Sequence, residues 1–242
     1  MSKNILITGV SQGLGFAIAE AVLAAGNTVY GVSRRLTPEF EALKHKYQGR
    51  VHFKACDLGQ PVDAVRCIFD NYVELKTPLH GFVNNAAMAY DDIVTNIQLK
   101  PLEAMYAVNV FTPMLFVRHS IRNMLYNNIK GAIVHVSSIS VHTGYKGLAM
   151  YASTKGALEA FSKNTAREWG ERGVRSNCLV AGFMETNMSA TLSNEVKQRI
   201  YRRTSLKQAT DIASVAETVN YLLSDNARSI TGQNVFVDSG TV

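Results

Sequence analysis

The chain has little of what marks membrane, secreted or metal-binding proteins. No apolar run is long enough to span a bilayer, and the N-terminus, MSKNILITG, lacks the basic segment, long apolar core and cleavage site of a secretory signal. The three cysteines, Cys56, Cys67 and Cys178, form no C-x-x-C pair, which argues against a disulfide framework or a structural zinc site. The six histidines have no metal-ligand spacing. These absences predict a cytoplasmic protein without a bound metal or membrane contact.

The charge balance is basic, with 25 Lys and Arg against 19 Asp and Glu and a formal net charge of +6. The basic residues are scattered, without a Lys/Arg tract or interleaved aromatics, so we expect no nucleic-acid partner. A phosphorylated cofactor or an acidic protein partner would explain the charge equally well. Charge alone therefore does not identify the partner.

Short apolar runs that favour strands alternate with longer segments of helical period. Strands are expected at 4–8, 28–32, 51–55, 79–83, 132–136, 174–180 and 234–237, and helices at 16–26, 61–75, 101–125 and 151–169. This alternation predicts an α/β, doubly wound Rossmann fold: a seven-stranded, mostly parallel sheet with helices on both faces. No repeat or linker divides the chain, so residues 1–242 are expected to form a single domain.

One polar, basic segment, Gly182 to Ser205, separates the sixth expected strand from the last helix. Segments over the carboxyl ends of parallel strands are often lids, so we expect a substrate lid at about 183–206. An ordinary exposed helix pair is the alternative.

The stretch TGVSQGLG, Thr8 to Gly15, stands between the first strand and the first helix. Glycines at 9, 13 and 15 let the backbone turn tightly and approach a pyrophosphate, and the helix N-terminus directs its free amides at that anion. A glycine triplet alone is weak evidence, but its place at the start of a βαβ pattern predicts a dinucleotide site.

The spacing Tyr-x-x-x-Lys occurs three times, beginning at Tyr72, Tyr126 and Tyr151. On a helix each pair would share a face, so the spacing does not choose among them. Only Tyr151 follows a strand, AIVHVSS, whose carboxyl end carries a serine, Ser138. Ligands of open α/β sheets bind outside those ends, so Tyr151 is the copy that can reach them, and the family resemblance given next selects the same copy.

Taken in order, TGxxxGxG, NNAA (84–87), the serine thirteen positions before Tyr151, YxxxK and the closing ITGQNVFVDSG resemble the short-chain dehydrogenase/reductase family over essentially the whole chain. The resemblance is greatest to the compact branch that includes 3-oxoacyl-[acyl-carrier-protein] reductases. It implies that the single domain binds a dinucleotide, and that the chain assembles as a homotetramer or homodimer through the long fourth helix and the Tyr151 helix.

The resemblance implies four catalytic residues: Asn109, Ser138, Tyr151 and Lys155. Reduction of a carbonyl needs a hydride on carbon and a proton on oxygen, and a free tyrosine, with a pKa near 10, is a poor donor at neutral pH. We expect the Lys155 cation to lower the pKa of Tyr151, helped by the positive charge of the oxidised nicotinamide, while Ser138 holds the carbonyl oxygen. Asn109 would steady a water-linked proton relay.

The second strand ends in VYGVSRR and offers Ser33, Arg34 and Arg35, with no acid before Glu39. An arginine there accommodates the 2′-phosphate of NADP, so NADP(H) is the predicted cofactor, although Gln12 stands where many NADP-using relatives carry a basic residue. The full set of cofactor-binding residues that the resemblance implies is Gly9, Ser11, Gln12, Gly13, Leu14, Gly15, Ser33, Arg34, Arg35, Asp57, Leu58, Asn84, Ala86, Tyr151, Lys155, Met184 and Thr186.

Two motifs depart from the family pattern. NNAA replaces NNAG, which adds one methyl group beside the cofactor, and AGFMET (181–186) replaces PGxxxT. Loss of that proline predicts a less rigid hinge for the lid.

The substrate is less well defined. The resemblance implies a NADPH-dependent enzyme that reduces a 3-oxoacyl thioester or related β-keto compound, with acyl carrier protein as a possible partner. Arg172 matches one carrier-docking arginine, but the other position holds Ile129. Two alternatives stay open: reduction of a free small-molecule ketone, and a catalytically idle dinucleotide sensor. A sugar-nucleotide epimerase would need a longer C-terminal substrate region.

Overall fold

A computed structural model describes residues 2–186, 189 and 192–242. Within them, seven strands form one sheet in the order β3-β2-β1-β4-β5-β6-β7, and every neighbouring pair is parallel. The strands are β1 (Asn4–Thr8), β2 (Thr28–Ser33), β3 (Val51–Ala55), β4 (Gly81–Asn84), β5 (Ala132–Ser138), β6 (Arg175–Ala181) and β7 (Asn234–Val237). The predicted fold class is confirmed, and the sheet is parallel throughout rather than mostly so.

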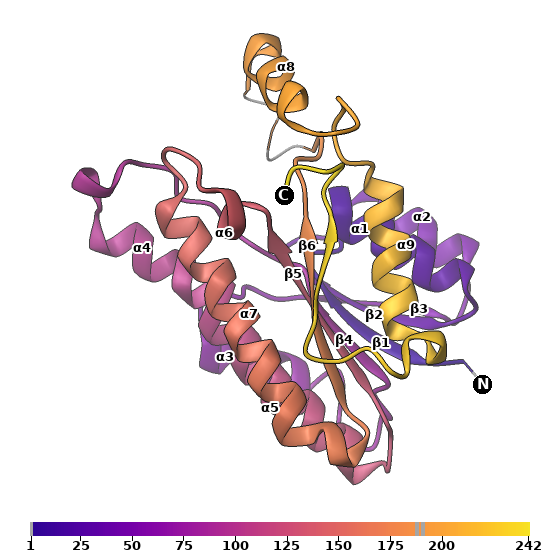
Figure 1. The fold of residues 1–242 in the computed structure, drawn as a ribbon. Coiled ribbons are helices and arrows are strands. Elements are labelled where there is room, and N and C mark those ends of the chain that lie inside the picture. Colours follow the sequence, from indigo (N-terminus) through magenta and orange to yellow (C-terminus); the bar gives the residue numbers. More distant parts are fainter. Residues whose placement is uncertain (1, 187–188, 190–191) are drawn as a thin grey trace.

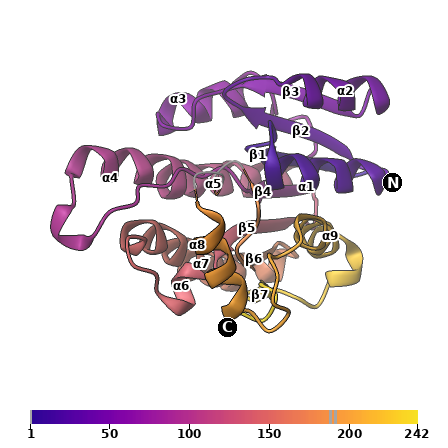
Figure 2. The ribbon, with the colours of Figure 1, turned by 90° about the horizontal axis from the view of Figure 1, so that it is seen from above.

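Helices cover both faces of the sheet (Figures 1 and 2). One face carries α1 (Gly13–Ala24), α2 (Pro38–Lys46) and α9 (Ile212–Leu223), and the other carries α3 (Pro61–Val65), α4 (Leu99–Tyr106), α5 (Thr112–Tyr126) and α7 (Ala149–Trp169). Alternation along β1 divides the core accordingly: Ile5 and Ile7 pack in the cluster with α1 and α9, whereas Leu6 packs in the cluster with Phe116 of α5. The remaining described elements are η1 (Arg66–Asp70), η2 (Val94–Asn96), η3 (Ala107–Phe111), α6 (Ser140–Thr143), η4 (Gly170–Arg172), α8 (Asn194–Arg203) and η6 (Asp225–Ala227).

Two of the predicted helices differ from the structure, one in where it ends and the other in its hydrogen-bonding pattern. The helix predicted over 61–75 ends at Asp70, because Asn71 turns back and its side-chain amide donates to the Arg66 carbonyl at 2.9 Å. The helix predicted over 101–125 is continuous, but residues 107–111 form the π-helical turn η3 between α4 and α5. Such turns interrupt α-helices frequently at functional sites.

The strand order reverses between β1 and β4, and the carboxyl ends of all strands lie at one edge of the sheet. Open α/β sheets bind ligands in the crevice outside that edge at the reversal point. Helix α8 stands above this edge (Figure 1). The described part of the chain contains no helix both long and apolar enough to cross a membrane. It also holds no group of three or more His, Cys, Asp or Glu suited to a metal ion.

Candidate active site

The glycine loop follows β1 and leads directly into α1. Gly9 has a φ of +77°, and a Cβ there would lie 2.8 Å from Nδ2 of Asn85; a Cβ at Gly15 would collide with the Gly9 carbonyl oxygen. A Cβ at Gly13, by contrast, would meet only Thr186, at 3.8 Å, so the space before the N-terminus of α1 is open. Because that terminus presents free amides and a positive dipole end, the loop fits a pyrophosphate.

The end of β2 is tied to this loop by hydrogen bonds. The Ser11 backbone N–H donates to Oγ of Ser33 at 3.2 Å, and the Ser11 hydroxyl donates to the Arg35 carbonyl at 2.6 Å. The side chains of Arg34 and Arg35 are exposed and line the same cavity as the loop, whereas Glu39 does not. The rim of the cavity is therefore basic where β2 ends.

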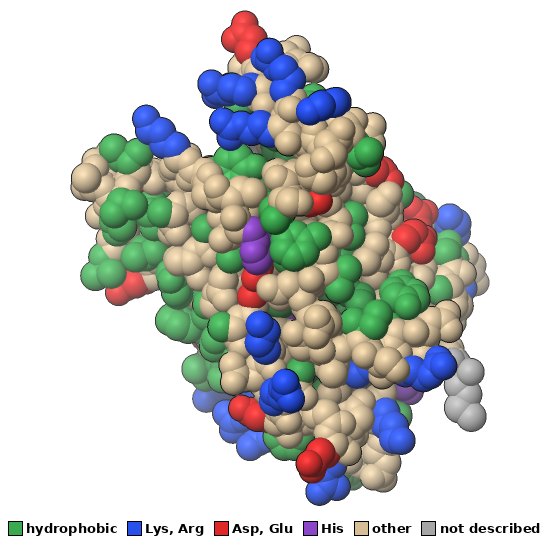
Figure 3. All heavy atoms as spheres, viewed as in Figure 1, with side chains coloured by type: hydrophobic (Ala, Val, Ile, Leu, Met, Phe, Trp, Pro, Cys, Tyr) green, Lys and Arg blue, Asp and Glu red, His purple; other side chains and the backbone are tan. Residues whose placement is uncertain are grey.

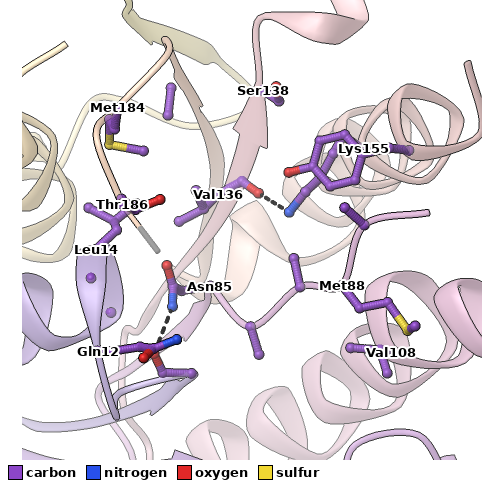
Figure 4. Close-up of a pocket in the computed structure, with 18 of the residues that line it drawn as sticks. Gln12, Leu14, Asn85, Met88, Val108, Val136, Ser138, Lys155, Met184 and Thr186 are labelled. Carbon is purple, nitrogen blue, oxygen red and sulfur yellow. Dashed lines mark hydrogen bonds between the residues drawn. The ribbon is translucent and has the colours of Figure 1, made fainter. Parts of the chain in front are cut away.

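One cavity of about 1600 Å³ lies along the carboxyl edge and is lined by Arg34 and Asp57 as well as by Ser138 and Tyr151. Figure 4 shows part of it, between Gln12, Asn85 and Lys155. Pockets for drug-sized ligands measure roughly 300–1,000 Å³, so this one has room for a dinucleotide and a second molecule. All the predicted site residues line it except Asn84 and Asn109.

Asn84 lies behind the cavity wall. It is 2% exposed, and its Nδ2 is 3.3 Å from Nδ1 of His135. Its neighbour Asn85 lines the cavity, and the Asn85 amide donates to the carbonyls of Thr8 and Gly9 at 2.9 and 3.2 Å. The side chain that faces the glycine loop is thus that of Asn85, which the family pattern did not select.

Ser138, Tyr151 and Lys155 share one wall of the cavity. Ser138 ends β5, and its Oγ accepts hydrogen bonds from the Ser140 hydroxyl at 3.0 Å and the Ser140 backbone N–H at 3.2 Å. The Lys155 ammonium donates to the Val136 carbonyl of the same strand at 2.8 Å (Figure 4). It also lies 5.6 Å from the centre of the Tyr151 ring. Strand β5 and helix α7 therefore bring the three groups together.

The electrostatics differ from the expectation for Tyr151. Burial raises the pKa of the Tyr151 phenol, with the Asp91 carboxylate as a second cause in the same direction, so the expected net lowering of this pKa is not found in the protein without ligand. Burial also lowers the pKa of Lys155 to about 8. The reason is common to both residues, since removal from water disfavours phenolate and ammonium alike.

Asn109 lies in the π-helical turn and is buried one layer below the cavity. Its carboxamide accepts from the Met88 N–H at 2.9 Å and donates to the Met88 carbonyl at 2.8 Å and to Oγ1 of Thr154 at 3.0 Å. Asn109 therefore joins the cavity-lining segment after β4 to helix α7, beside Lys155.

The other two Tyr-x-x-x-Lys copies lie away from the cavity. Tyr72 follows the end of η1, not within a helix as expected, and its hydroxyl donates to the Gly31 carbonyl at 3.3 Å. Tyr126 is the last residue of α5 and is 57% exposed.

The segment after β6 passes over the glycine loop. Its Phe183 carbonyl accepts from the Thr210 N–H at 2.8 Å, and the Gly182 N–H donates to the Val237 carbonyl at 2.9 Å. These bonds tie the turn to β7 and to the segment before α9 without the family's proline, and the less rigid hinge stays a prediction. The predicted lid of 183–206 includes residues 187, 188, 190 and 191, which lie outside the described residues.

Several lining residues were not predicted from the sequence. Polar and charged examples are Asn85, Asp91, Ser140, Arg199 and Arg203. The sequence does contain a pattern that indicates the two arginines. They are four residues apart and share a helix face with Val196 and Ile200, and this face of α8 lines the cavity.

Comparison with known proteins is consistent with this geometry. A family model described as enoyl-(acyl carrier protein) reductase matches residues 9–242. The chain is 33% identical to the 3-oxoacyl-[acyl-carrier-protein] reductase FabG of Aquifex aeolicus (strain VF5), over 98% of this chain and 96% of that protein. It is 29% identical to the L-xylulose reductase of Caenorhabditis elegans, over 98% and 95% of the two chains.

Two solved structures share the fold. A 4-hydroxyisoleucine dehydrogenase complexed with NADH superimposes with a TM-score of 0.92 at 23% identity, covering 100% of this chain and 99% of the other. A protein assigned as a 2-deoxy-D-gluconate 3-dehydrogenase from Agrobacterium tumefaciens, with bound NADP, gives 0.89 at 24% identity, covering 99% and 96%. Matches of this extent establish that the chain belongs to the short-chain dehydrogenase/reductase family and is an NAD(P)-dependent oxidoreductase.

Proposed function

We propose that the protein is a single-domain, NADPH-dependent reductase that converts a ketone, a 3-oxoacyl thioester or a related β-keto compound, into a secondary alcohol. The observation that carries this proposal is the grouping of Ser138, Tyr151 and Lys155 on one wall of a cavity with a glycine loop at its other side. The bound dinucleotide supplies the hydride.

The hydrogen bonds of Ser138 suit it to hold the carbonyl oxygen. Its Oγ already accepts from the Ser140 hydroxyl and N–H, so its own proton is left to donate to a substrate. Tyr151 donates the proton that the new alcohol needs, and burial keeps its phenol protonated until then. Lys155 holds a positive charge beside the ring and stabilises the phenolate that remains.

Cofactor choice rests on Arg34 and Arg35 at the end of β2. Both side chains line the cavity, and neither has an ion pair with a carboxylate among the described residues, so both are available to the 2′-phosphate of NADPH. The relative from Agrobacterium tumefaciens with bound NADP supports this assignment, while the 4-hydroxyisoleucine dehydrogenase carries NADH.

Substrate class rests on the relative from Aquifex aeolicus, whose name describes reduction of a 3-oxoacyl group on acyl carrier protein. Docking of a carrier at Arg172 has less support. That residue ends η4, past the 21-residue helix α7, which puts it about 30 Å along the helix axis from Tyr151, and it does not line the cavity of the same chain.

A substrate panel tests the proposal. Purified protein is mixed with NADPH or NADH and with acetoacetyl thioesters, β-keto esters or simple ketones, and absorbance at the reduced-nicotinamide band is followed. Oxidation of NADPH in preference to NADH by at least one β-keto compound is the expected result. Tight NADPH binding with no turnover of any ketone would instead identify a dinucleotide sensor and refute the proposal.

A further inference from the structure

Helix α8 presents one mixed face to the cavity. The residues of this segment that line it are Leu192, Val196, Arg199, Ile200 and Arg203. Their spacing of three and four places them along one side of the helix. That side combines an apolar stripe with two guanidinium groups one turn apart, and Lys146 lines the cavity from the loop between α6 and α7.

The cations of this region divide into two groups. Lys197 pairs with Glu185 at 3.9 Å, Nε of Arg202 donates to the Gln198 carbonyl, and neither Lys197 nor Arg202 lines the cavity. Glu185 also accepts a hydrogen bond from the Tyr201 hydroxyl.

The two cavity-lining arginines have no such partner. Neither Arg199 nor Arg203 has a side-chain hydrogen bond or an ion pair with any residue that the structure describes, and both are exposed to the cavity. Figure 3 shows basic side chains gathered over α8, at the top of the molecule. The unpaired charge is thus on the side of the helix that a ligand would meet.

The cofactor site does not account for these arginines. The glycine loop and the N-terminus of α1 serve the pyrophosphate, and Arg34 and Arg35 stand at the end of β2. Figure 2 shows α8 over the half of the molecule that contains α7, β6 and β7, while β2 and α2 lie in the other half. The two arginine pairs therefore belong to different ends of the cavity, and α8 is at the end that holds Tyr151.

We propose that the ketone substrate carries an anionic group, a carboxylate or a phosphate monoester, which Arg199 and Arg203 bind while an apolar stretch packs on Val196 and Ile200. This inference rests on the proposed function. Guanidinium groups one turn apart offer several donors in forks that match carboxylate and phosphate oxygens. A neutral ketone would leave that side of the cavity without a complementary charge.

Pairs of substrates that differ only in charge test the inference. One set compares 4-oxopentanoate, 6-oxoheptanoate and 8-oxononanoate with their methyl esters, and the other compares acetoacetyl-4′-phosphopantetheine with acetoacetyl-pantetheine. We expect kcat/KM for the anionic member of at least one pair to exceed that of its neutral partner by about tenfold or more. The first set reports a carboxylate and the second a phosphate.

The variants R199Q and R203Q should each lower kcat/KM for the anionic member about tenfold, leaving the neutral member and the KM for NADPH within about twofold. The matched control is R202Q, on the same helix but outside the cavity, which should preserve the preference. Equal turnover of charged and neutral partners by the unmodified enzyme would overturn the inference, as would a rise in the KM for NADPH as the main effect of R199Q and R203Q.

Failure of the proposed function is distinguishable from failure of this inference. If no ketone is turned over, calorimetry of 8-oxononanoate and of its methyl ester binding to the NADPH complex still reports the charge preference. Binding of the acid alone, weakened by R199Q and R203Q, supports an anion site; equal binding of acid and ester refutes it.

Discussion

Replacement of Lys155 by methionine should abolish activity yet raise stability at neutral pH. The side chain is 2% exposed, and burial lowers its pKa from 10.5 to about 8. Each unit by which the pKa differs between the folded and unfolded protein corresponds to about 1.4 kcal/mol. Keeping this lysine charged in the folded protein therefore costs about 3 kcal/mol at pH 7. Methionine has a similar length and no charge.

The pH dependence of the free energy of unfolding distinguishes the cost of the buried charge from any change in packing that the methionine causes. The folded-state pKa is lower than the unfolded one, so the unfolded chain binds more protons between pH 8 and 10.5, and the penalty disappears as pH rises through that window. It should fall from about 3 kcal/mol at pH 7 to less than about 1 kcal/mol at pH 10. Loss of the hydrogen bond to the Val136 carbonyl affects the methionine variant at every pH and cancels in the comparison.

Guanidinium chloride unfolding at pH 7 and pH 10 measures the effect, with fluorescence of the only tryptophan, Trp169 at the end of α7, as the signal. Protein concentration is held fixed because assembly would add to the apparent stability. K163M, on an exposed position of the same helix, is the control and should show the same difference from the unmodified protein at both pH values. If the advantage of K155M over the unmodified protein does not shrink between pH 7 and pH 10, a buried ammonium with a lowered pKa is not what this site contains.

The remaining predictions concern chemistry and cofactor. Tyr151→Phe should abolish turnover and leave the Kd for NADPH within about twofold, because the ring stays and only the proton donor is lost. Tyr72→Phe and Tyr126→Phe should keep near-normal kcat, although Tyr72→Phe loses its bond to a backbone carbonyl and about 1 kcal/mol of stability; loss of turnover in either would remove Tyr151 from its role. Arg34→Asp should shift the ratio of kcat/KM for NADPH over NADH toward NADH by about tenfold or more, since a carboxylate repels the 2′-phosphate. An unchanged ratio would mean that the residues at the end of β2 do not determine the preference for NADPH over NADH.

The fold was predictable because each strand is a short apolar run and each long helix shows its period. Parallel strands buried on both faces leave an unmistakable alternation with helices, and the sequence also placed the glycine loop between the first strand and the first helix. The hydrophobic periodicity of the sequence does not indicate where the backbone hydrogen bonding of a helix changes locally. The π-helical turn at Ala107–Phe111 and the early end of η1 at Asp70 both depend on such changes.

The site was predictable in its positions but not in its electrostatics. Spacing places Tyr151 and Lys155 on one face, yet the pKa of each depends on how much water reaches it, which no spacing reports. The NNAA motif likewise includes both Asn84 and Asn85 but does not indicate which side chain faces the glycine loop. Successive residues at a strand end point to opposite sides, and the structure shows that Asn85 is the one that contacts the loop. The phase of α8 was readable from Arg199 and Arg203 once the segment was known to be helical.

Different elements supply the proposed reacting groups and the walls of the cavity around them. Strand β5 provides Ser138 and the carbonyl that accepts from Lys155, and α7 provides Tyr151 and Lys155, so the proposed proton delivery depends on two elements packed in the core. The substrate end is walled by α8, which stands above the sheet (Figure 1). A fold shared at a TM-score of 0.92 with a 4-hydroxyisoleucine dehydrogenase at 23% identity does not specify a substrate. Substitutions on the cavity face of α8 should therefore change which ketone is accepted while the tyrosine and lysine continue to work as before.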